Sequence, residues 1–384
     1  MPDTPLDECT VQLNDALGSE LHGDMALSAE AARLRYVNDG TPGFARKRTA
    51  TGFRYVDRQG RPLHDKTHLA RIKALAIPPA WREVWICPYA NGHIQATGVD
   101  VKGRKQYRYH KEWRAIRDEA KYAHMLDFAL HLPLIRQQVD ADLAKPGLCR
   151  EKVLALVIAL LEKTMIRVGN DEYARTNKSF GLTTLRNRHV EVQGGRIAFH
   201  FRGKSRVEHA IELQNARLAR LVRKMKDLPG QALFQYVDDA GERHAVSSSD
   251  VNAYLKAMTG RDYTAKDFRT WSGTLHTFQS LTTLEPFENQ TQAKKNVVQA
   301  ITEAARKLGN TPTICRKCYV HPLIIETYMA GKLLEAVTDG NVQEGTAQEG
   351  TAQEGTEAPG TMESIEQHVL QLLQRQLAAS QNSQ

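Results

Sequence analysis

The sequence predicts an α+β protein, in which a small β-rich N-terminal domain precedes a larger, mainly α-helical domain that contains a β-hairpin sheet. Apolar residues alternate with polar ones in the stretch from residue 53 to residue 99, which also holds the hairpin signal Asn91-Gly92. Helical spacing dominates after residue 115. A second alternating stretch, centred on Gly194-Gly195, interrupts those helices. With 384 residues and 41% hydrophobic content, the chain can bury a core in each domain.

The elements of the N-terminal domain follow in order. Residues 1–27 are polar and are expected to form a flexible lead-in. Ser28 begins a short helical pattern that a Gly/Pro-rich turn ends. Alternation predicts strands at Phe53–Tyr55 and Val84–Ile86, and Ile94–Val99 is the return strand of the Asn-Gly hairpin. These residues predict a sheet closed by helices.

Helical spacing recurs through most of the second domain. The predicted helices are Ala115–Asp142, Val153–Met165, Asn215–Leu228, one capped by Asp250, one opened by a capping box at Thr264–Asp267, Gln292–Leu308 with Gly309 as its stop, and Leu323–Ala336. The second of these is apolar on every side, which is typical of a buried central helix. Two alternating hairpins separate the early helices from the late ones, and Lys204 lies at the tip of the second hairpin.

We therefore expect five segments. They are a flexible segment at 1–27, a β-rich domain at 28–115, a mainly helical domain at 116–336, an acidic linker of near-identical QEGTA repeats at 337–361 and an amphipathic helix or tail at 362–384.

Charge is distributed unevenly between these segments. The whole chain carries a net charge of +8, but the part from Ala336 onward has seven acidic side chains and one basic one, which leaves +14 on the remainder. A body this basic favours a polyanionic partner. The longest apolar run, Val153–Leu161, is too short to cross a bilayer, and no apolar signal core begins the chain, so no membrane role is expected.

Five scattered cysteines argue against a disulfide framework and favour a reducing, cytoplasmic location. Cys315 and Cys318 have the spacing of half a zinc site or a redox pair, but no second pair of ligands follows. Packing cysteines are therefore the favoured interpretation, and no metal site is predicted.

The segment Gly309–Pro322 holds the most suggestive chemistry. Tyr319 follows two cations, Arg316 and Lys317, and lies between a Thr-Pro turn and a proline that can open a helix. A phenol is a weak nucleophile until the charge that it develops is neutralised. One short segment cannot surround a phosphodiester, so distant cations are needed.

Two such cations, and one further basic segment, stand out. Arg167 ends the buried helix and Lys204 lies at a hairpin tip, and each is either a structural or solvated side chain or a group aimed at a ligand. Cations and aromatics also interleave from Lys102 to Arg114. That mixture suits a surface that grips phosphates and touches bases, although a solvated hairpin edge has the same composition.

Several separate segments resemble the type IB DNA topoisomerases, in particular the compact bacterial and poxvirus branch. The matching segments, which occur in the family's order, are Pro79–Trp81 through Gln95–Gly98, Gly103–Tyr107, Ile166–Asn170, Gly203–Ser205, Lys266–Thr270, and Asn310–Pro312 through Tyr319. The resemblance runs from about Arg35 to Leu334 and leaves out the acidic repeats and the last helix.

The resemblance implies a mechanism and a set of residues. Tyr319 would attack one phosphodiester of double-stranded DNA and form a 3′-phosphotyrosyl ester, and religation after strand rotation would relax supercoils. Arg167 and Arg269 would bind the non-bridging oxygens, and Lys204 would protonate the leaving 5′-oxygen. Neither ATP, another cofactor nor a metal would be needed. The enzyme would act as a monomer on DNA, associated with the nucleoid.

One departure from the family pattern concerns Asn310, because poxvirus-type and nuclear members have histidine nine residues before the tyrosine. An amide can donate to a phosphate oxygen but brings no charge, so we expect the same role with a smaller contribution. The resemblance also implies DNA contacts for six further residues: Arg104, Lys105, Gln106, Tyr107, Tyr109 and Lys266.

Two alternatives remain open from sequence. A tyrosine site-specific recombinase shares the catalytic chemistry, although such enzymes typically have histidine three residues before the second arginine, where this chain has Lys266. A non-catalytic architectural DNA-binding protein could use the same scaffold, with Asn310 as its visible defect.

Overall fold

The computed structural model describes residues 25–333 and 362–381, and the chain divides into two compact units, Met1–His124 and Met125–Gln384. The division falls inside the long helix α4 (Lys111–Ala144). Each unit has its own sheet and its own apolar core. The expected domain limits, including those of the flexible, linker and tail segments, remain predictions, and residues 1–24, 334–361 and 382–384 lie outside the described part.

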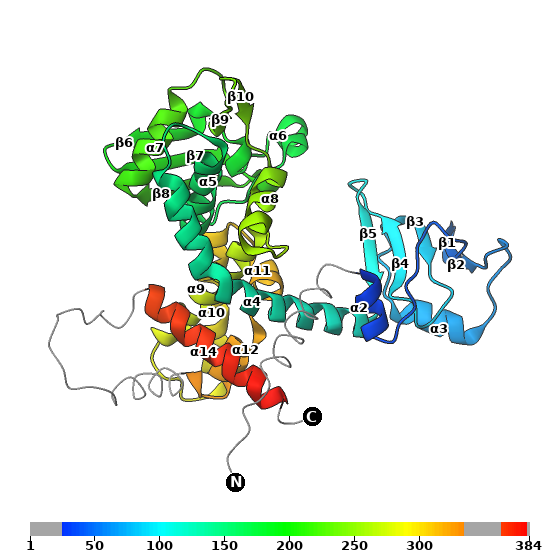
Figure 1. Cartoon of the computed structure of the whole chain (residues 1–384). Coiled ribbons are helices and arrows are strands. Elements are labelled where there is room, and N and C mark those ends of the chain that lie inside the picture. Colours follow the sequence, from blue (N-terminus) through cyan, green and yellow to red (C-terminus); the bar gives the residue numbers. More distant parts are fainter. Residues whose placement is uncertain (1–24, 334–361, 382–384) are drawn as a thin grey trace, which may run out of the picture. The chain divides into compact units, whose positions relative to one another are not determined.

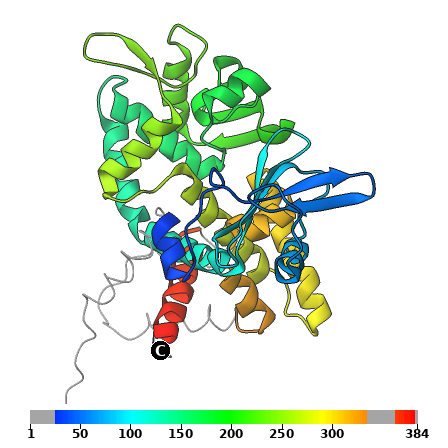
Figure 2. The ribbon, with the colours of Figure 1, turned by 90° about the vertical axis from the view of Figure 1, so that its right-hand side faces the viewer.

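The first unit is built on a five-stranded antiparallel sheet (Figure 1). Its strands run in the order β2 (Gly52–Val56), β1 (Phe44–Thr49), β3 (Arg82–Ile86), β4 (Ile94–Val99) and β5 (Lys105–Tyr109). Figure 2 shows the β1–β2 hairpin, in blue, at one edge of this sheet. The predicted hairpin at Asn91-Gly92 is confirmed, because β3 and β4 pair across it.

The core of this unit lies between the sheet and helix α3 (Lys66–Ala74). Phe44, Val84, Ile86 and Ala96 project from the strands and pack with Ile72 of the helix. The short helix α2 (Met25–Ala31) begins before Ser28 and ends sooner than its pattern predicted. Ala29 of this helix, with Ala32 and Leu34 just after it, packs on Trp113 at the start of α4.

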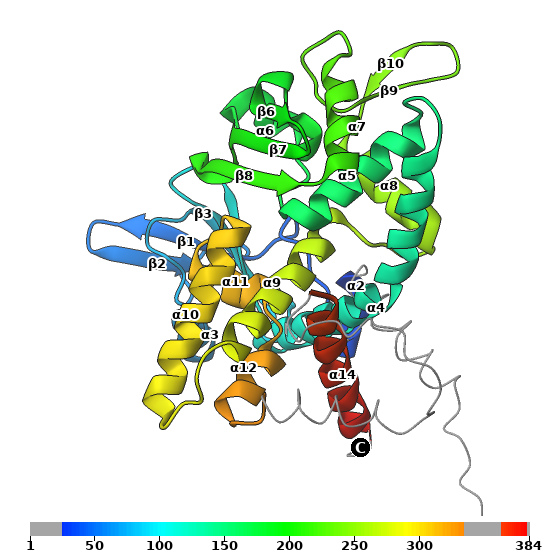
Figure 3. The same ribbon diagram turned by 90° about the vertical axis from the view of Figure 1, so that its left-hand side faces the viewer.

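The second unit is mainly helical, which confirms the predicted fold class. Its helices after α4 are α5 (Arg150–Thr164), α6 (Asp171–Asn177), α7 (Ala216–Lys226), α8 (Ser248–Thr259), α9 (Ala265–Thr282), α10 (Gln290–Leu308), α11 (Pro312–Tyr319), α12 (Pro322–Met329) and α14 (Met362–Gln381). Figure 3 shows α9 to α12 gathered at one end of this unit, with the small sheets at the other.

Helix α5 is the centre of the second core. Nine consecutive residues, Val153–Leu161, are all buried, as the unbroken apolar run predicted. Because neighbouring elements surround the helix on every side, its C-terminal end is held in a fixed place. That end points at the site described below.

The hairpin sheet of this unit consists of the strands that the sequence predicted. Strands β6 (Val190–Gln193), β7 (Arg196–Arg202) and β8 (Glu208–Gln214) pair antiparallel in that order, with Phe199 and Phe201 buried on the core side. A shorter hairpin, β9 (Gln235–Val237) and β10 (Arg243–Ala245), had no sequence signal strong enough to predict it.

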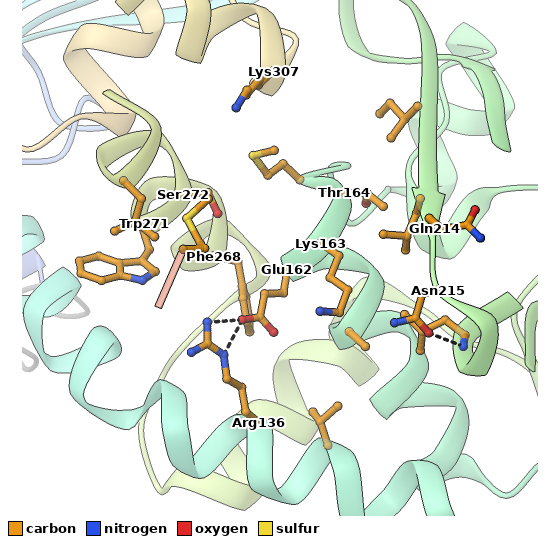
Figure 4. A pocket seen from close by; sticks show the side chains of 18 of the residues that line it. Arg136, Glu162, Lys163, Thr164, Gln214, Asn215, Phe268, Trp271, Ser272 and Lys307 are labelled. Atoms are coloured by element: carbon orange, nitrogen blue, oxygen red, sulfur yellow. Dashed lines mark hydrogen bonds and ion pairs between the residues drawn. The ribbon is translucent and has the colours of Figure 1, made fainter. Parts of the chain in front are cut away.

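Helix α14 packs on the second unit although it follows the acidic repeats. Its residues Ile365, Val369 and Leu373 are buried in the unit's core. Glu366 accepts two hydrogen bonds of 2.8 Å from Arg136 of α4, and Arg136 also donates to Glu162 of α5 at 2.7 Å (Figure 4). This helix is therefore part of the fold of the second unit.

Two local predictions need correction. Ser247, and not Asp250, is the N-cap of α8; Asp250 instead occupies the third position of the helix and completes a capping box with Ser247. Helix α12 ends at Met329 and does not continue to Ala336, because Gly331 takes a left-handed conformation with φ of 76°.

Candidate active site

The loop that follows α5 positions Arg167. Met165 ends the helix in a left-handed conformation, and the chain then runs against Gly181, where a Cβ atom would lie 2.5 Å from the carbonyl oxygen of Arg167. The same oxygen accepts a 2.9 Å hydrogen bond from the backbone of Leu182. Close backbone packing therefore fixes the start of the Arg167 side chain.

Arg269 projects from the first turns of α9 and is almost wholly buried, with 4% of its surface exposed. Its guanidinium donates to the carbonyl oxygen of Met165 and, at 2.8 Å, to that of Leu308. These carbonyls belong to the C-terminal ends of α5 and α10, where helices carry unsatisfied acceptors and partial negative charge. Two helix ends thus hold the cation without a carboxylate.

The turn after α10 brings Asn310 to Arg167. Gly309 ends the helix in the left-handed conformation that the sequence predicted, and its carbonyl oxygen accepts a 3.2 Å hydrogen bond from Arg167. The Asn310 side-chain oxygen accepts a second one from the same guanidinium nitrogen. The amide nitrogen of Asn310 is buried and has no hydrogen-bond partner within residues 25–333 and 362–381. An unused buried donor beside a guanidinium is suited to binding an anionic oxygen.

Tyr319 is the last residue of α11, which packs closely on α9. A Cβ atom at Gly273 of α9 would lie only 2.5 Å from the Tyr319 carbonyl oxygen, so glycine is needed for this approach. The Thr274 hydroxyl lies 3.4 Å from the same oxygen. The Arg269 guanidinium carbon lies 5.3 Å from the centroid of the Tyr319 ring. The two cations before it, Arg316 and Lys317, are exposed.

Lys204 lies in the tight turn between β7 and β8. The turn is a short 3-10 segment, Lys204–Arg206, in which Ser205 and Arg206 both have positive φ. Lys204 is exposed and lines one small pocket together with Arg167 and Arg269. The structure therefore brings together residues that lie far apart in the sequence.

The electrostatics of this pocket are unusual for a protein interior. Within residues 25–333 and 362–381, no carboxylate forms an ion pair with Arg167 or Arg269, and the Arg269 Nε atom is buried without a hydrogen-bond partner. Burial, followed by the charge of Arg167, lowers the pKa of Arg269 to about 10. Burial also lowers the pKa of Arg167, while the neighbouring Tyr319 acts in the opposite direction. Uncompensated buried cations are costly, so the site is organised for an anion that the residues described by the structure do not supply.

Five of the six residues expected to contact DNA belong to the first unit. Arg104, at the turn before β5, pairs with Asp100 at 2.7 Å, and Lys105 pairs with Asp39 at 2.7 Å. Gln106 also donates to Asp100, at 3.1 Å. Hydrogen bonds from Arg104 lower the pKa of Asp100 to about 2.

The aromatic residues of β5 form a stack. Tyr107, which is 41% exposed, lies parallel to Tyr109 with 5.8 Å between ring centroids, and Tyr109 in turn stacks on Trp113. Lys266, in the second unit, is exposed in the first turn of α9. Arg104, Lys105, Tyr107 and Lys266 are exposed, whereas Gln106 and Tyr109 are half-buried, and the DNA contacts of all six stay a prediction.

Comparison with known families matches both parts of the chain. Residues 52–100 match the model described as bacterial DNA topoisomerase IB, N-terminal domain, and residues 110–336 match the model described as eukaryotic DNA topoisomerase I, catalytic core. The second match covers more than half of the chain. The chain belongs to the type IB DNA topoisomerases. The resemblance inferred from sequence is therefore confirmed.

Viral type IB enzymes are among the similar proteins. The DNA topoisomerase 1B of Acanthamoeba polyphaga mimivirus is 34% identical over 267 residues, which is 68% of this chain and 80% of the viral protein. That of vaccinia virus (strain Copenhagen) is 26% identical over 252 residues, or 64% of this chain and 76% of the viral protein. Helix α14 lies outside the matched catalytic core.

Family membership assigns this chain type IB topoisomerase activity on DNA, and it favours a topoisomerase over the recombinase alternative. In the part of the chain that the structure describes, no helix is both long and apolar enough to span a membrane.

Cys315 is buried in the core of the catalytic unit, where burial raises the pKa of its thiol to about 11.

Sequence reasoning missed several residues that shape this type IB site. Gly273 and Thr274 hold the Tyr319 backbone. His209 lines the pocket with Arg167, Lys204 and Arg269. A glycine inside a predicted helix is a usable signal, because it costs stability that packing must recover. A lone histidine in an alternating strand gives no such signal.

A larger cavity of about 940 Å³ adjoins the pocket, and the two share Met165, Ile211 and Lys307 in their linings. Figure 4 shows Lys307 at one side of this cavity and Trp271, Phe268 and Arg136 at another. Lys307 lies 3.1 Å from the His276 Nδ1 atom. Burial and that charge lower the pKa of His276 to about 4.

Proposed function

We propose that Tyr319 is the nucleophile with which this type IB topoisomerase cleaves one strand of double-stranded DNA. The Tyr319 oxygen bonds to the scissile phosphorus, and the bond from phosphorus to the 5′-oxygen breaks. The 3′-phosphotyrosyl ester keeps the energy of the broken bond, so religation needs no ATP. Rotation of the free strand before religation relaxes supercoils.

Arg167, Arg269 and Asn310 stabilise the pentacoordinate phosphorane in this proposal. The observation that carries it is the pair of guanidiniums next to the Tyr319 ring, which are held by helix-end carbonyls and have no carboxylate partner among the described residues. Donors fixed before the reaction begins need no reorganisation as negative charge grows on the phosphate oxygens. The unused Asn310 amide nitrogen supports a third contact, in place of the histidine found in poxvirus-type members.

Lys204 is the general acid. Its turn is open to solvent and faces the pocket that holds the two arginines, which suits a group that must reach the leaving 5′-oxygen. An alkoxide is a poor leaving group without a proton, whereas the phenol of Tyr319 can lose its proton between two cations.

The experiment is covalent trapping on an oligonucleotide whose 5′ product diffuses away, compared between wild type and Tyr319→Phe. Wild type should form a protein–DNA adduct that peptide mapping assigns to Tyr319, and the variant should form none while it binds the duplex equally well. An adduct on any other residue overturns the assignment. If neither protein formed an adduct or relaxed DNA while both bound the duplex, only an architectural DNA-binding role would remain.

A second comparison separates the recombinase alternative. Relaxation of a plasmid that lacks any special site, in the presence of EDTA, is expected at full rate. Failure on such a plasmid, combined with cleavage at one preferred sequence, would favour recombination.

DNA contact by the first unit is part of the same proposal. The exposed cations and stacked tyrosines of β5, together with Lys266 of α9, are suited to phosphate and base contacts on the duplex. The excess of basic residues over the body of the chain supports this, and one copy acting alone on DNA in the cytoplasm, at the nucleoid, is the simplest arrangement.

A further inference from the structure

His209 lies in the active site between two turns of the chain, one at Gly203 and one at Gly309. It lies opposite Phe201 in the β7–β8 ladder, and the two rings stack with 5.0 Å between centroids and 14° between planes. It also lines the pocket that holds Arg167, Lys204 and Arg269. None of the roles in the proposed mechanism uses this residue.

Two glycines make room for the imidazole from opposite parts of the chain. A Cβ atom at Gly203, the residue before Lys204, would lie 2.6 Å from the ring. A Cβ atom at Gly309, the residue before Asn310, would lie 2.4 Å from it. The ring is therefore in close contact with the turn that carries the general acid and with the turn that carries the phosphate donor.

This contact matters because the hydrogen bonds of the Lys204 turn fix its backbone at the base, including one of 2.8 Å from Gly203 to Val207, while its tip lies in solvent. Lys204, Ser205 and Arg206 are all exposed, and the turn contains two non-glycine residues with positive φ. Gly203 is buried, so the ring contacts the turn at its inner end. A rigid planar group stacked on the buried Phe201 ring is a fixed surface against which this end of the turn can rest.

We propose that His209 is a positioning residue that fixes the Lys204 turn relative to the Gly309–Asn310 turn, so that the general acid reaches the leaving oxygen. This inference rests on the assignment of Lys204 under the proposed function. The ring acts through its shape and its stacking, and it gives no proton to the DNA.

The charges around the ring agree with a neutral, packed imidazole. Arg167, Arg269, Lys204 and Lys307 line the same pocket, and Glu208 is the neighbouring acidic group. Burial, followed by the charges of Arg167 and Arg269, lowers the pKa of His209. The imidazole is accordingly neutral at neutral pH and adds no further charge to the phosphate site.

The test is single-turnover cleavage by the full chain on two matched oligonucleotides, one with the normal 5′-oxygen and one with a bridging 5′-thiolate, which leaves without a proton. His209→Ala should slow cleavage of the oxygen substrate on the order of tenfold to a hundredfold, as expected when a catalytic group is misplaced. It should cleave the thiolate substrate at nearly the wild-type rate. His209→Phe keeps a planar ring on Phe201 and should restore most of the oxygen rate.

Lys204→Ala is the control that separates this inference from the proposed function. If Lys204→Ala shows no thiolate rescue, the general-acid assignment itself fails. If Lys204→Ala is rescued and His209→Ala is equally slow on both substrates, His209 acts on the phosphate clamp or on folding, and the positioning role is overturned. If His209→Phe is as slow as His209→Ala but both are rescued by thiolate, the imidazole takes part in proton transfer, which also overturns it.

A double-mutant cycle tests directly whether the His209 ring contacts the Lys204 turn. Gly203→Ala alone should push the ring aside and slow cleavage, because Gly203 has an ordinary φ of −94° and only the contact is strained. In the His209→Ala background, the vacated space should accept the added methyl group, so Gly203→Ala should have little further effect. Additive effects would contradict contact between ring and turn.

Discussion

Cations gather at two places in this molecule, and the two places hold them in opposite ways. At β5, Arg104 and Lys105 have side chains that are 66% and 51% exposed, and each pairs with an aspartate. In the catalytic unit, Arg269 is 4% exposed and is held by main-chain carbonyls. An exposed ion pair contributes little to stability and exchanges its carboxylate for a phosphate at small cost. A buried guanidinium that has no carboxylate partner can instead bind an anionic group that enters the site.

The difference explains how one enzyme can combine adjustable DNA binding with demanding chemistry. Under the proposed function, the exposed pairs respond to salt, so they set the affinity for DNA and permit release. The buried Arg269 guanidinium costs folding energy, which the packed core around α5, α9 and α10 offsets. If this difference holds, substitutions at the buried cation should change the cleavage rate, and substitutions at the exposed cations should change only DNA affinity.

Arg269→Ala should have the largest effect. Loss of one preorganised donor to a developing oxyanion costs about 10²–10³ in rate, and Arg269→Lys should recover little, because one ammonium cannot bond both carbonyls and the phosphate. The measurement is the single-turnover cleavage rate at saturating protein. Arg104→Ala is the matched control and should leave that rate unchanged. Similar losses in both variants would end the distinction between the two places.

Acid should destabilise the catalytic unit through His276. Its pKa is about 4 in the folded protein because of burial and Lys307, against an ordinary value near 6.5. Since the unfolded state takes up the proton first, the stabilisation is complete above pH 6.5 and is lost as the pH falls toward 4, by about 2 kcal/mol. Chemical denaturation of wild type and His276→Gln between pH 7 and pH 4.5 measures this. Equal losses in both proteins would contradict the assignment.

Asn310→Ala should slow cleavage by about tenfold, since a neutral donor contributes roughly 1–2 kcal/mol. Asn310→His tests the departure from poxvirus-type members directly. A charged donor in the same place should match or exceed the wild-type rate below the pKa of the new side chain. An Asn310→Ala rate equal to wild type would mean that the unused amide nitrogen does not contact the phosphate.

Local rules predicted much of the catalytic unit. The buried run of α5, the capping box at Thr264 and Asp267, and the left-handed stop at Gly309 each depend on a few neighbouring residues. Strand β1, by contrast, was missed, because only Phe44 of its six residues is buried and no alternation marks it. Its place comes from pairing with β2 and β3, which sequence spacing does not reveal.

The candidate site also has a part that sequence motifs predicted and a part that only the tertiary fold reveals. Motif resemblance pointed to Tyr319, Arg167, Lys204 and Arg269, but the reason they suit an anion was hidden. The carbonyls of Met165 and Leu308 that hold Arg269 come from helix ends more than a hundred residues apart, and only the tertiary fold brings them together. His209 and Gly273 were missed for the same reason, since their roles consist of contacts with distant backbone.

The smallest effect is expected at the surface cations. Asp39→Asn with Asp100→Asn removes the carboxylates that compete with phosphate for Lys105 and Arg104, so duplex affinity should rise a few-fold at moderate salt. Arg104→Ala with Lys105→Ala should weaken binding and reduce the slope of log affinity against log salt by about two, or roughly one for each lost phosphate contact. Fluorescence anisotropy on a labelled duplex across a salt series measures both. The cleavage rate of the bound complex should be the same in all three proteins, because these side chains set how much enzyme is on DNA and do not touch the reacting phosphate. A changed cleavage rate at saturation would place β5 in the chemistry and would remove the contrast between the two groups of cations.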